Sequence, residues 1–482
     1  MAHPPGALPV PLRAESPMAG LDRRNLGPLQ VFAQSVSGAA PSAAMAAAPA
    51  VAAVTAGQAV LWSFVVATCL ALLIGLCIGQ FTRRMAAAGS LYSLTAKGLG
   101  PVPAFMCGWA LLTGYGLLAM AALVGAGSYL QDLLRRVGVP PGWPLLAGLV
   151  LLLGLLATVL VLRGVRLSAQ VVLVVEAVAI TLLLVVFGLL LARIGPWAGS
   201  APFAPDEGIG GIAAGVLPAI GGFVGFEAAA SFGVEARRPF QTVPRAVQWT
   251  AGLCGVLYLV AAYTQVIGLQ GLPGKLAGQP EPVSTLAQLQ RMPWLSVLLD
   301  VGIAASFFAC TMATGGALVR VLLSMGREGI VPRRFGATHP RYRTPHVAIL
   351  VALPVATLVP VVLLAAGVPW TRLFVVLLNV AVFGYLIAYL LVCVAAPVFL
   401  HRIGELTRGA VAASAVSVPV LLVAVVAFTV SGSGDGYPLM FALLAAAGLV
   451  WFAWVRLRRA DRLPAIGIYD ETSAADLFDG HR

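Results

Sequence analysis

The chain has 482 residues, of which 60% are hydrophobic and 10% are charged, and its mean hydropathy is +0.95. A soluble domain carries about 25% charged residues, so this composition excludes a soluble globular protein and predicts an all-α polytopic membrane protein. The formal net charge of +12 comes mainly from arginines in short loops between apolar runs, which is typical of membrane topology and not of nucleic-acid binding.

Twelve apolar runs are long enough to cross a bilayer. In that setting the backbone must form its hydrogen bonds internally, so each run predicts a transmembrane helix, and the runs are too continuous for barrel strands. The expected spans are residues 28–54, 59–80, 101–130, 144–162, 170–193, 209–233, 247–270, 296–325, 346–366, 373–398, 410–430 and 437–455.

The distribution of basic residues predicts the orientation of the chain. Twelve spans place both termini on one side of the membrane. Of the 30 basic residues, 24 lie in the two tails or in the loops on that side. Since basic residues accumulate in cytoplasmic loops, both termini are expected in the cytoplasm.

Two spans carry helix-breaking residues in matched positions. The first span contains Gly38, Pro41 and Pro49, and the sixth contains Pro218 and the glycine pair 221–222. Proline removes a backbone donor and glycine adds conformational freedom, so both helices are expected to be interrupted near mid-depth. Close helix packing by small residues is the alternative explanation, but it does not account for the matched positions.

The first span begins on the inner side and the sixth on the outer side, so the breaks indicate two five-helix units of inverted topology. A six-plus-six arrangement would instead place the repeat near the middle of the chain. The predicted parts are a cytoplasmic N-terminal tail (1–27), a first repeat (28–193), a second, inverted repeat (209–400), helices 11 and 12 (410–455), and a cytoplasmic C-terminal tail (456–482) that is expected to be mobile.

Three stretches resemble the amino acid–polyamine–organocation (APC) permeases, over about residues 24–400 and more loosely to 455. They read RRMAAAGSLYSLTAKGLGPVPAFMCGW after span 2, FVGFE within span 6, and VRVLLSMGREGIVP after span 8. The resemblance implies the LeuT-like five-plus-five fold with two additional helices. It also implies a secondary transporter that moves amino acids by alternating access. The chain departs from the family pattern at Ser37-Gly38-Ala39 and lacks a bulky aromatic gate near Gly221.

The two interruptions form the expected substrate site. The first would present free N–H groups to a carboxylate at a positive helix end, and the second would present free carbonyls to an ammonium group, which fits an α-amino acid. Hydroxyl groups on spans 3 and 8 are candidates for reading the rest of the substrate, although ordinary hydrogen bonding between helices explains them equally well. The candidate residues are Ser37, Gly38 and Ala39 in the first break, Gly221, Gly222 and Phe223 in the second, and Tyr115, Thr113, Thr311 and Thr314 on the flanking spans.

Two acidic residues lie well inside spans, namely Glu227 just after the second break and Glu176 in span 5. A carboxyl in a low dielectric can exist protonated or charged according to its neighbours, as proton coupling requires. Each is therefore a candidate for proton coupling, with a structural hydrogen-bonding role as the alternative. Exchange stays open as an energy source, and so does sodium, for which Thr311 and Thr314 could supply oxygens.

Other function classes find little support. The histidines are scattered, the cysteines lack metal-type spacing, and no ATP-binding loop occurs, so no catalytic residue, metal or cofactor is expected. A membrane-embedded enzyme is therefore a remote alternative, and a transporter of polyamines or other organic amines is the closer one. The expected partners are a small-molecule substrate and the lipid bilayer of the cell membrane, without nucleic acid, and a homodimer is left open.

Overall fold

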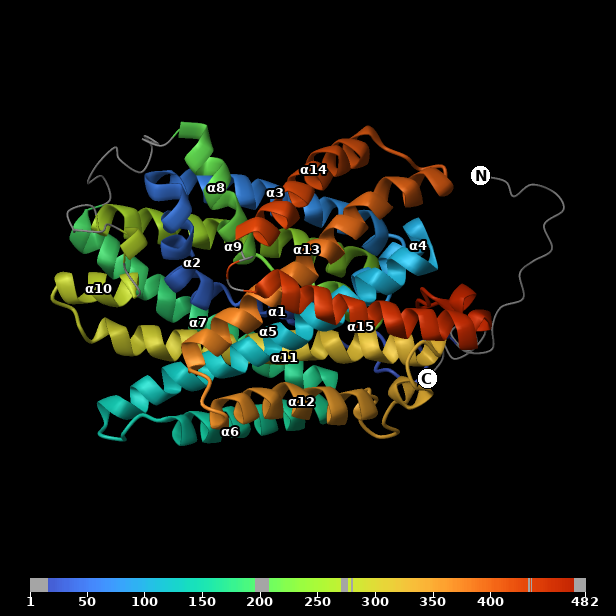
Figure 1. Ribbon diagram of the computed structural model, residues 1–482, viewed down its shortest axis with the longest axis horizontal. Coiled ribbons are helices and arrows are strands. Elements are labelled where there is room, and N and C mark those ends of the chain that lie inside the picture. Colours follow the sequence, from blue (N-terminus) through green and yellow to red (C-terminus); the bar gives the residue numbers. More distant parts are fainter. Residues whose placement is uncertain are drawn as a thin grey trace.

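The computed structural model describes residues 16–195, 208–269, 276–278, 281–431, 434 and 436–471 (Figure 1). Most of the helices run along the long axis of the molecule. Within the described residues there is no β-strand, only an isolated bridge between Leu26 and Ala236. The predicted all-α class is therefore confirmed.

The helices follow the expected spans closely. Those of the first half are α1 (Pro28–Gly38), α2 (Pro41–Ala56), α3 (Val60–Thr82), α4 (Leu91–Leu99), α5 (Pro101–Arg136), α6 (Trp143–Leu162) and α7 (Val165–Ile194). Those of the second half are α8 (Gly208–Gly221), α9 (Pro239–Gly268), α10 (Pro282–Leu289), α11 (Leu295–Glu328), α12 (His346–Ala365) and α13 (Trp370–Arg402), followed by α14 (Arg408–Ser431) and α15 (Tyr437–Arg458). The short 3₁₀ turns used below are η3 (Ala228–Phe232), η5 (Arg333–Gly336) and η6 (Ala460–Ala465).

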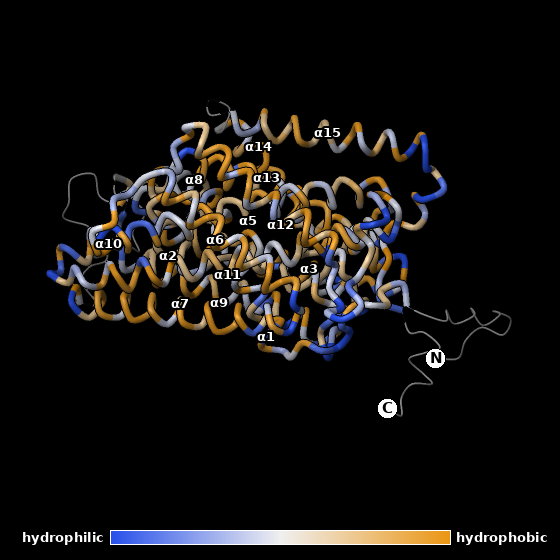
Figure 2. The backbone as a smooth tube through the Cα atoms, turned by 90° about the horizontal axis from the view of Figure 1, so that it is seen from below, coloured by the Kyte–Doolittle hydropathy of each residue, from blue (hydrophilic) through white to orange (hydrophobic). Residues whose placement is uncertain are grey.

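The apolar helices are long enough to cross a membrane. Ten candidate spans occur in the described part of the chain, one of which, Pro28–Thr82, joins α1 to α3 across a break, and a shorter apolar helix covers Gly210–Gly221. Figure 2 shows hydrophobic residues along the length of the bundle and hydrophilic ones gathered at its two ends. This distribution is that of an integral membrane protein, while the count of twelve spans stays a prediction.

Both predicted interruptions are present. α1 ends at Gly38 and α2 begins at Pro41, with Ala40 between them at φ +45°. α8 ends at Gly221, and the chain then turns through Gly225 at φ +91° into η3. The expectation that Pro49 and Pro218 also break these helices is wrong, because both lie inside continuous helices, whose neighbours can satisfy the freed backbone groups.

Counterpart helices of the two halves pack against each other. α3 lies against α9, α5 against α11, and α6 against α12, the last pair side by side at one edge in Figure 1. Inverted repeats related by a pseudo-two-fold axis in the membrane plane bring counterparts together in this way. The packing therefore fits the five-plus-five arrangement, and α14 and α15 follow it.

The two ends of the described chain meet at one end of the bundle, called here the terminal end. Ser16 Oγ donates to Asp470 Oδ1 over 2.7 Å, and Arg23 Nη2 lies 2.8 Å from the same oxygen. The expectation of a mobile C-terminal extension is wrong for residues 460–471, because charge pairing and hydrogen bonds hold this polar segment. The remaining parts of the predicted tails, residues 1–15 and 472–482, lie outside the described residues.

Candidate functional site

The two helix breaks lie directly against each other. A Cβ on Gly38 would come within 2.3 Å of the Gly225 carbonyl oxygen, and a Cβ on Gly225 would come equally close to the Gly38 carbonyl oxygen. Ser35 Oγ donates to the Phe226 carbonyl, and the Cys310 thiol of α11 lies 3.4 Å from the Gly38 carbonyl oxygen as a donor. The unwound segments and α11 therefore meet at one point in the centre of the bundle.

This contact predicts a large effect of a single methyl group. Gly38→Ala would force the two unwound segments apart, and overpacking of a tight contact costs about 1–3 kcal/mol. We expect substrate uptake to fall at least about ten-fold, since displacements of about an ångström disturb positioned groups that strongly. Uptake into proteoliposomes measures the effect, with Gly252→Ala as the control, because a Cβ at Gly252 meets no atom within 4 Å. Equal uptake by the two variants would show that the close contact between the two helix breaks is not needed for uptake.

The free backbone donors of the first break lie a few residues further along the chain than the predicted Ser37, Gly38 and Ala39. The Ala39 N–H donates to the Val36 carbonyl and the Ala40 N–H to the Ser37 carbonyl, each over 3.1 Å. Since the first N–H groups of a helix have no partner within it, the donors that remain at the start of α2 belong to Ser42 and Ala43. The positive end of α2 therefore points at the break.

The second break keeps one open face. A Cβ on Gly221 would meet no atom within 4 Å, so this backbone borders open space. The Gly222 carbonyl accepts from Tyr258 Oη over 2.6 Å, and the Phe223 carbonyl accepts from the Phe226 N–H over 3.2 Å. The Phe223 ring packs edge-on against Tyr258 with centroids 4.9 Å apart. Tyr258 is thus a site residue that the sequence analysis missed, although it is a tyrosine inside an apolar span.

The predicted hydroxyl groups on the flanking helices donate to protein partners. Thr113 donates to the Trp109 carbonyl, Thr311 to the Phe307 carbonyl and Thr314 to the Cys310 carbonyl, each within its own helix. Thr311 directly follows Cys310, and Thr314 donates to the Cys310 carbonyl. Because the Cys310 thiol contacts Gly38, this turn of α11 lies beside the first break. Tyr115 instead points to Glu227.

Glu227 is fully buried and both of its carboxyl oxygens are engaged. Tyr115 Oη of α5 donates to Oε1 over 2.9 Å, and Tyr389 Oη of α13 donates to Oε2. Tyr389 Oη also accepts from the Gly225 N–H over 3.1 Å. The carboxyl therefore ties the second break to two helices, and Tyr389, which the sequence analysis missed, follows Tyr385 at helical spacing.

Glu176 has a different environment. Its residue is 2% exposed, and Oε1 accepts from Ser306 Oγ over 3.1 Å. Oε2 has no partner with hydrogen-bond geometry among the described residues, but Ser37 of the first break is a polar neighbour close enough to interact with this carboxyl. Gln34 Oε1, Ser37 Oγ and Ser42 Oγ are likewise buried without a partner in the described part of the chain. With Glu176 Oε2 they are four of the thirteen such atoms in the described part of the chain, and they gather beside the first break, where a proton or a bound group would complete the network.

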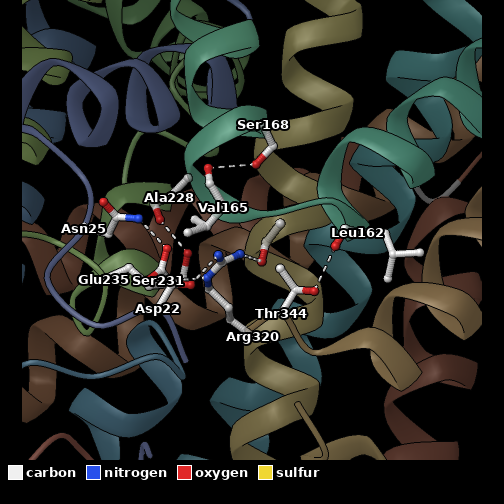
Figure 3. A network of polar contacts seen from close by, with 11 residues as sticks. Asp22, Asn25, Leu162, Val165, Ser168, Ala228, Ser231, Glu235, Arg320 and Thr344 are labelled. Atoms are coloured by element: carbon white, nitrogen blue, oxygen red, sulfur yellow. Dashed lines mark hydrogen bonds and ion pairs between the residues drawn. The ribbon is translucent and has the colours of Figure 1, made fainter. Parts of the chain in front are cut away.

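A buried ion pair closes the terminal end (Figure 3). Arg320 of α11 donates from Nη2 and Nε to the two oxygens of Glu235, over 2.7 Å and 2.8 Å, and the side chains are 3% and 1% exposed. The guanidinium also lies 3.9 Å over the Phe232 ring. The Leu26 N–H donates to the Glu235 carbonyl, so the lead-in to α1 and the segment after η3 are held together and fixed to α11.

The opposite end is hollowed. A cavity of about 300 Å³ lies between α2, α5, α10 and α11, and Asp132, Glu281 and the Arg136–Asp300 ion pair line it. Arg136 Nη2 lies 2.7 Å from Asp300 Oδ2, and the arginine side chain is 43% exposed. The central site therefore lies between the buried ion pair at the terminal end and a cavity at the opposite end.

The C-terminal strap, defined as residues 460–471, adds a second layer to the closed end. The N–H groups of Gly467 and Ile468 donate to Glu328 Oε1 over 2.8 Å and 3.0 Å, and Tyr92 Oη donates to Oε2 of the same carboxylate. The Asp470 N–H donates to the Ala86 carbonyl over 2.7 Å. The strap thus joins the end of α11 to the loop after α3 and to the N-terminal lead-in.

We expect Asp470→Asn to loosen this strap. The substitution keeps the size of the side chain but removes the charge that pairs with Arg23, and a hydrogen bond to a charged group is worth about 1.5–3 kcal/mol. Hydrogen–deuterium exchange should therefore rise in residues 460–471 and in residues 16–27 together. Asp461→Asn is the matched control, because the Asp461 side chain is 68% exposed. Unchanged exchange in residues 16–27 would show that the strap does not hold this N-terminal segment in place.

Comparison with known proteins places the chain in a family. The family model described as amino acid permease matches residues 26–457. The branched-chain amino acid permease BcaP of Bacillus subtilis is 29% identical over 61% of this chain and 66% of that protein. The methylthioribose transporter of Bacillus subtilis is 28% identical over 61% and 65%, and the low-affinity putrescine importer PlaP of Escherichia coli (strain K12) is 26% identical over 58% and 62%. These alignments span less than two thirds of each relative's own length.

A solved structure supports the fold. The manganese transporter of Eremococcus coleocola matches with a TM-score of 0.53 over 90% of this chain and 95% of that chain, at 16% identity. At this identity the likeness concerns the fold alone. The relatives are named as transporters and permeases, in agreement with the resemblance to APC permeases. Because the family model covers nearly the whole described chain, the chain belongs to the amino acid permease family.

Proposed function

We propose that this protein is a secondary transporter that moves amino acids across the cell membrane by alternating access, with both termini in the cytoplasm. The observation that carries the proposal is the meeting of two interrupted helices between a closed terminal end and a hollowed opposite end. Because 24 of the 30 basic residues belong to the predicted inner side, the terminal end is the cytoplasmic one in this proposal, and the cavity at the opposite end faces the outside.

The polarity of the two breaks suits a zwitterion. A substrate carboxylate would accept from the N–H groups of Ser42 and Ala43 at the positive end of α2. The substrate ammonium would donate to the carbonyl of Gly221, at the negative end of α8. The open space beside Gly221 would then receive an apolar side chain. The similarity to a protein named as a branched-chain amino acid permease supports this substrate class.

Glu176 is the proton carrier in this proposal, and Glu227 is a brace. A carrier must gain and lose a proton in the working cycle, and Glu176 retains an oxygen without a partner beside the first break. Glu227 has two tyrosine donors, which favour one fixed arrangement. Movement of α1 during transport would alter the surroundings of Glu176 directly, because α1 packs against α7.

Transport of an organic amine is the second candidate. The unpaired oxygen of Glu176 could accept from a second ammonium group, and one relative is named as a putrescine importer. An amine without a carboxylate would leave the N–H groups of Ser42 and Ala43 without an anionic partner. For this reason the amino acid is the favoured substrate class.

Uptake of radiolabelled compounds into proteoliposomes tests the proposal. A panel of amino acids and diamines is offered with an inward proton gradient, with a sodium gradient, and with internal load of the same compound. Accumulation of apolar amino acids under the proton gradient is expected. Accumulation of diamines alone would support the second candidate, and uptake only with internal load would identify an exchanger. No uptake of any compound would contradict both.

A further inference from the structure

We propose that the terminal end carries a headgroup site for an anionic phospholipid, at the junction of α15 with the turn that follows α11. A cavity of about 550 Å³ lies there. Its lining combines four arginines with two tryptophans, an unusual concentration for a chain in which 10% of the residues are charged. These residues are Arg333, Arg334, Arg459, Arg462, Trp451 and Trp454.

The charges in this cavity are far from balanced. Asp461 is the acidic residue of the lining, and its Oδ2 lies 3.0 Å from Arg462 Nε, but its side chain is 68% exposed. Arg459 Nη1 donates to the Gly329 carbonyl over 3.3 Å, and its guanidinium lies 5.2 Å over the Trp454 ring. The exposed side chains of Arg333 and Arg334 donate to none of the described residues, and their planar groups suit the oxygens of a phosphate.

The position of the cavity selects a lipid over a soluble anion. α15 forms the outer edge of the molecule in Figure 2, apolar along its length and hydrophilic where it ends. Val450 is 71% exposed and Leu457, which lies between Arg456 and Arg458, is 83% exposed, so the exposed apolar face of this helix extends as far as its terminal arginines. Trp451 and Trp454 lie in its last turns, at the depth where amphipathic rings favour the interface. A ligand here therefore has its acyl chains along α15 and its phosphate among the arginines.

Anionic headgroups bind in basic pockets of this kind on the cytoplasmic side of membrane proteins. The phosphate chemistry alone would fit inorganic phosphate equally well. The apolar surface beside the cavity favours a lipid, because acyl chains can pack against it and inorganic phosphate cannot. The proposed site does not depend on which compound the protein transports.

Native mass spectrometry of the purified full chain in detergent tests the site. The protein is titrated with phosphatidylglycerol or phosphatidylcholine, and bound lipids are counted. Wild type should retain phosphatidylglycerol preferentially. Arg333→Gln/Arg334→Gln should weaken that binding about thirty-fold, as expected for two basic residues at a membrane surface.

Arg402→Gln/Arg408→Gln is the matched control, since it removes the same charge from exposed arginines at the last residue of α13 and the first residue of α14. This control should bind phosphatidylglycerol as wild type does. Equal weakening in both double variants would overturn the site in favour of general surface attraction, and unchanged binding in the cavity variant would overturn it outright. Thermal unfolding in lipid-free detergent checks that both variants fold, and phosphatidylglycerol should raise the midpoint in the control but not in the cavity variant.

A competition arm separates the two sources of phosphate. Inorganic phosphate or glycerol phosphate is added to the lipid-bound wild type at the concentration of the lipid. Neither should displace phosphatidylglycerol, because neither contacts the apolar face of α15. Displacement at equal concentration would identify a soluble-anion site and overturn the lipid proposal.

Discussion

Arg320→Met should destabilise the protein by about 3–5 kcal/mol and abolish uptake, because it leaves the Glu235 carboxylate buried without its partner. The two side chains are 3% and 1% exposed and share a bidentate contact. Methionine fills similar space along the Phe232 ring but supplies no donor. The thermal unfolding midpoint in detergent and uptake into proteoliposomes measure the two effects.

Two further variants separate a lost charge pair from general disruption. Arg320→Met/Glu235→Met removes both charges and should recover most of the stability, since the cost arises from an uncompensated buried charge. Arg136→Met breaks an ion pair at the opposite end whose arginine is 43% exposed and whose partner Asp300, 7% exposed, lines a cavity. This carboxylate is less enclosed than Glu235, so the variant should cost less stability than Arg320→Met. A single variant at Arg320 that is as stable as Arg136→Met would contradict the role of this pair as the closure of the terminal end.

Glu176→Gln should abolish accumulation driven by a proton gradient while exchange of internal for external substrate continues. The amide cannot release a proton, but its oxygen can still accept from Ser306, so the packing of α7 is retained. Uptake under an imposed proton gradient and counterflow without a gradient are measured on the same proteoliposomes. Loss of both proton-driven uptake and counterflow would indicate that Glu176 has a structural role.

Glu227→Gln is the comparison that shows which of the two carboxyl groups, Glu176 or Glu227, carries the coupled proton. Tyr115 and Tyr389 both donate to this side chain, and an amide offers only one oxygen to two donors. An unsatisfied buried group costs about 1–3 kcal/mol, so this variant should lower the unfolding midpoint and keep its proton coupling. Loss of proton-driven accumulation in Glu227→Gln, at unchanged midpoint and with Glu176→Gln still coupled, would reverse the two assignments.

Composition and local residue patterns were enough to predict the class of the protein, the course of its helices and the places where two of them break. These features follow from local causes. An apolar run of sufficient length must be helical in a bilayer, and a glycine such as Gly38 or a proline at the first position of α2 acts on its own neighbours along the chain. Pro49 and Pro218 show the limit of local reasoning, because packing around α2 and α8 tolerates them.

The partners of the buried polar groups became visible only once the helices were packed together. Glu227 meets partners 112 and 162 residues away, and Arg320 meets a carboxylate 85 residues away, so no pattern along the chain distinguishes the brace at Glu227 from the orphaned oxygen of Glu176. The strap was missed for the same reason, since Asp470 is held by Ser16 and Arg23 from the other end of the chain. Hydrophobic patterns report which residues leave water, whereas hydrogen bonds and ion pairs depend on the relative positions of helices, which packing alone fixes.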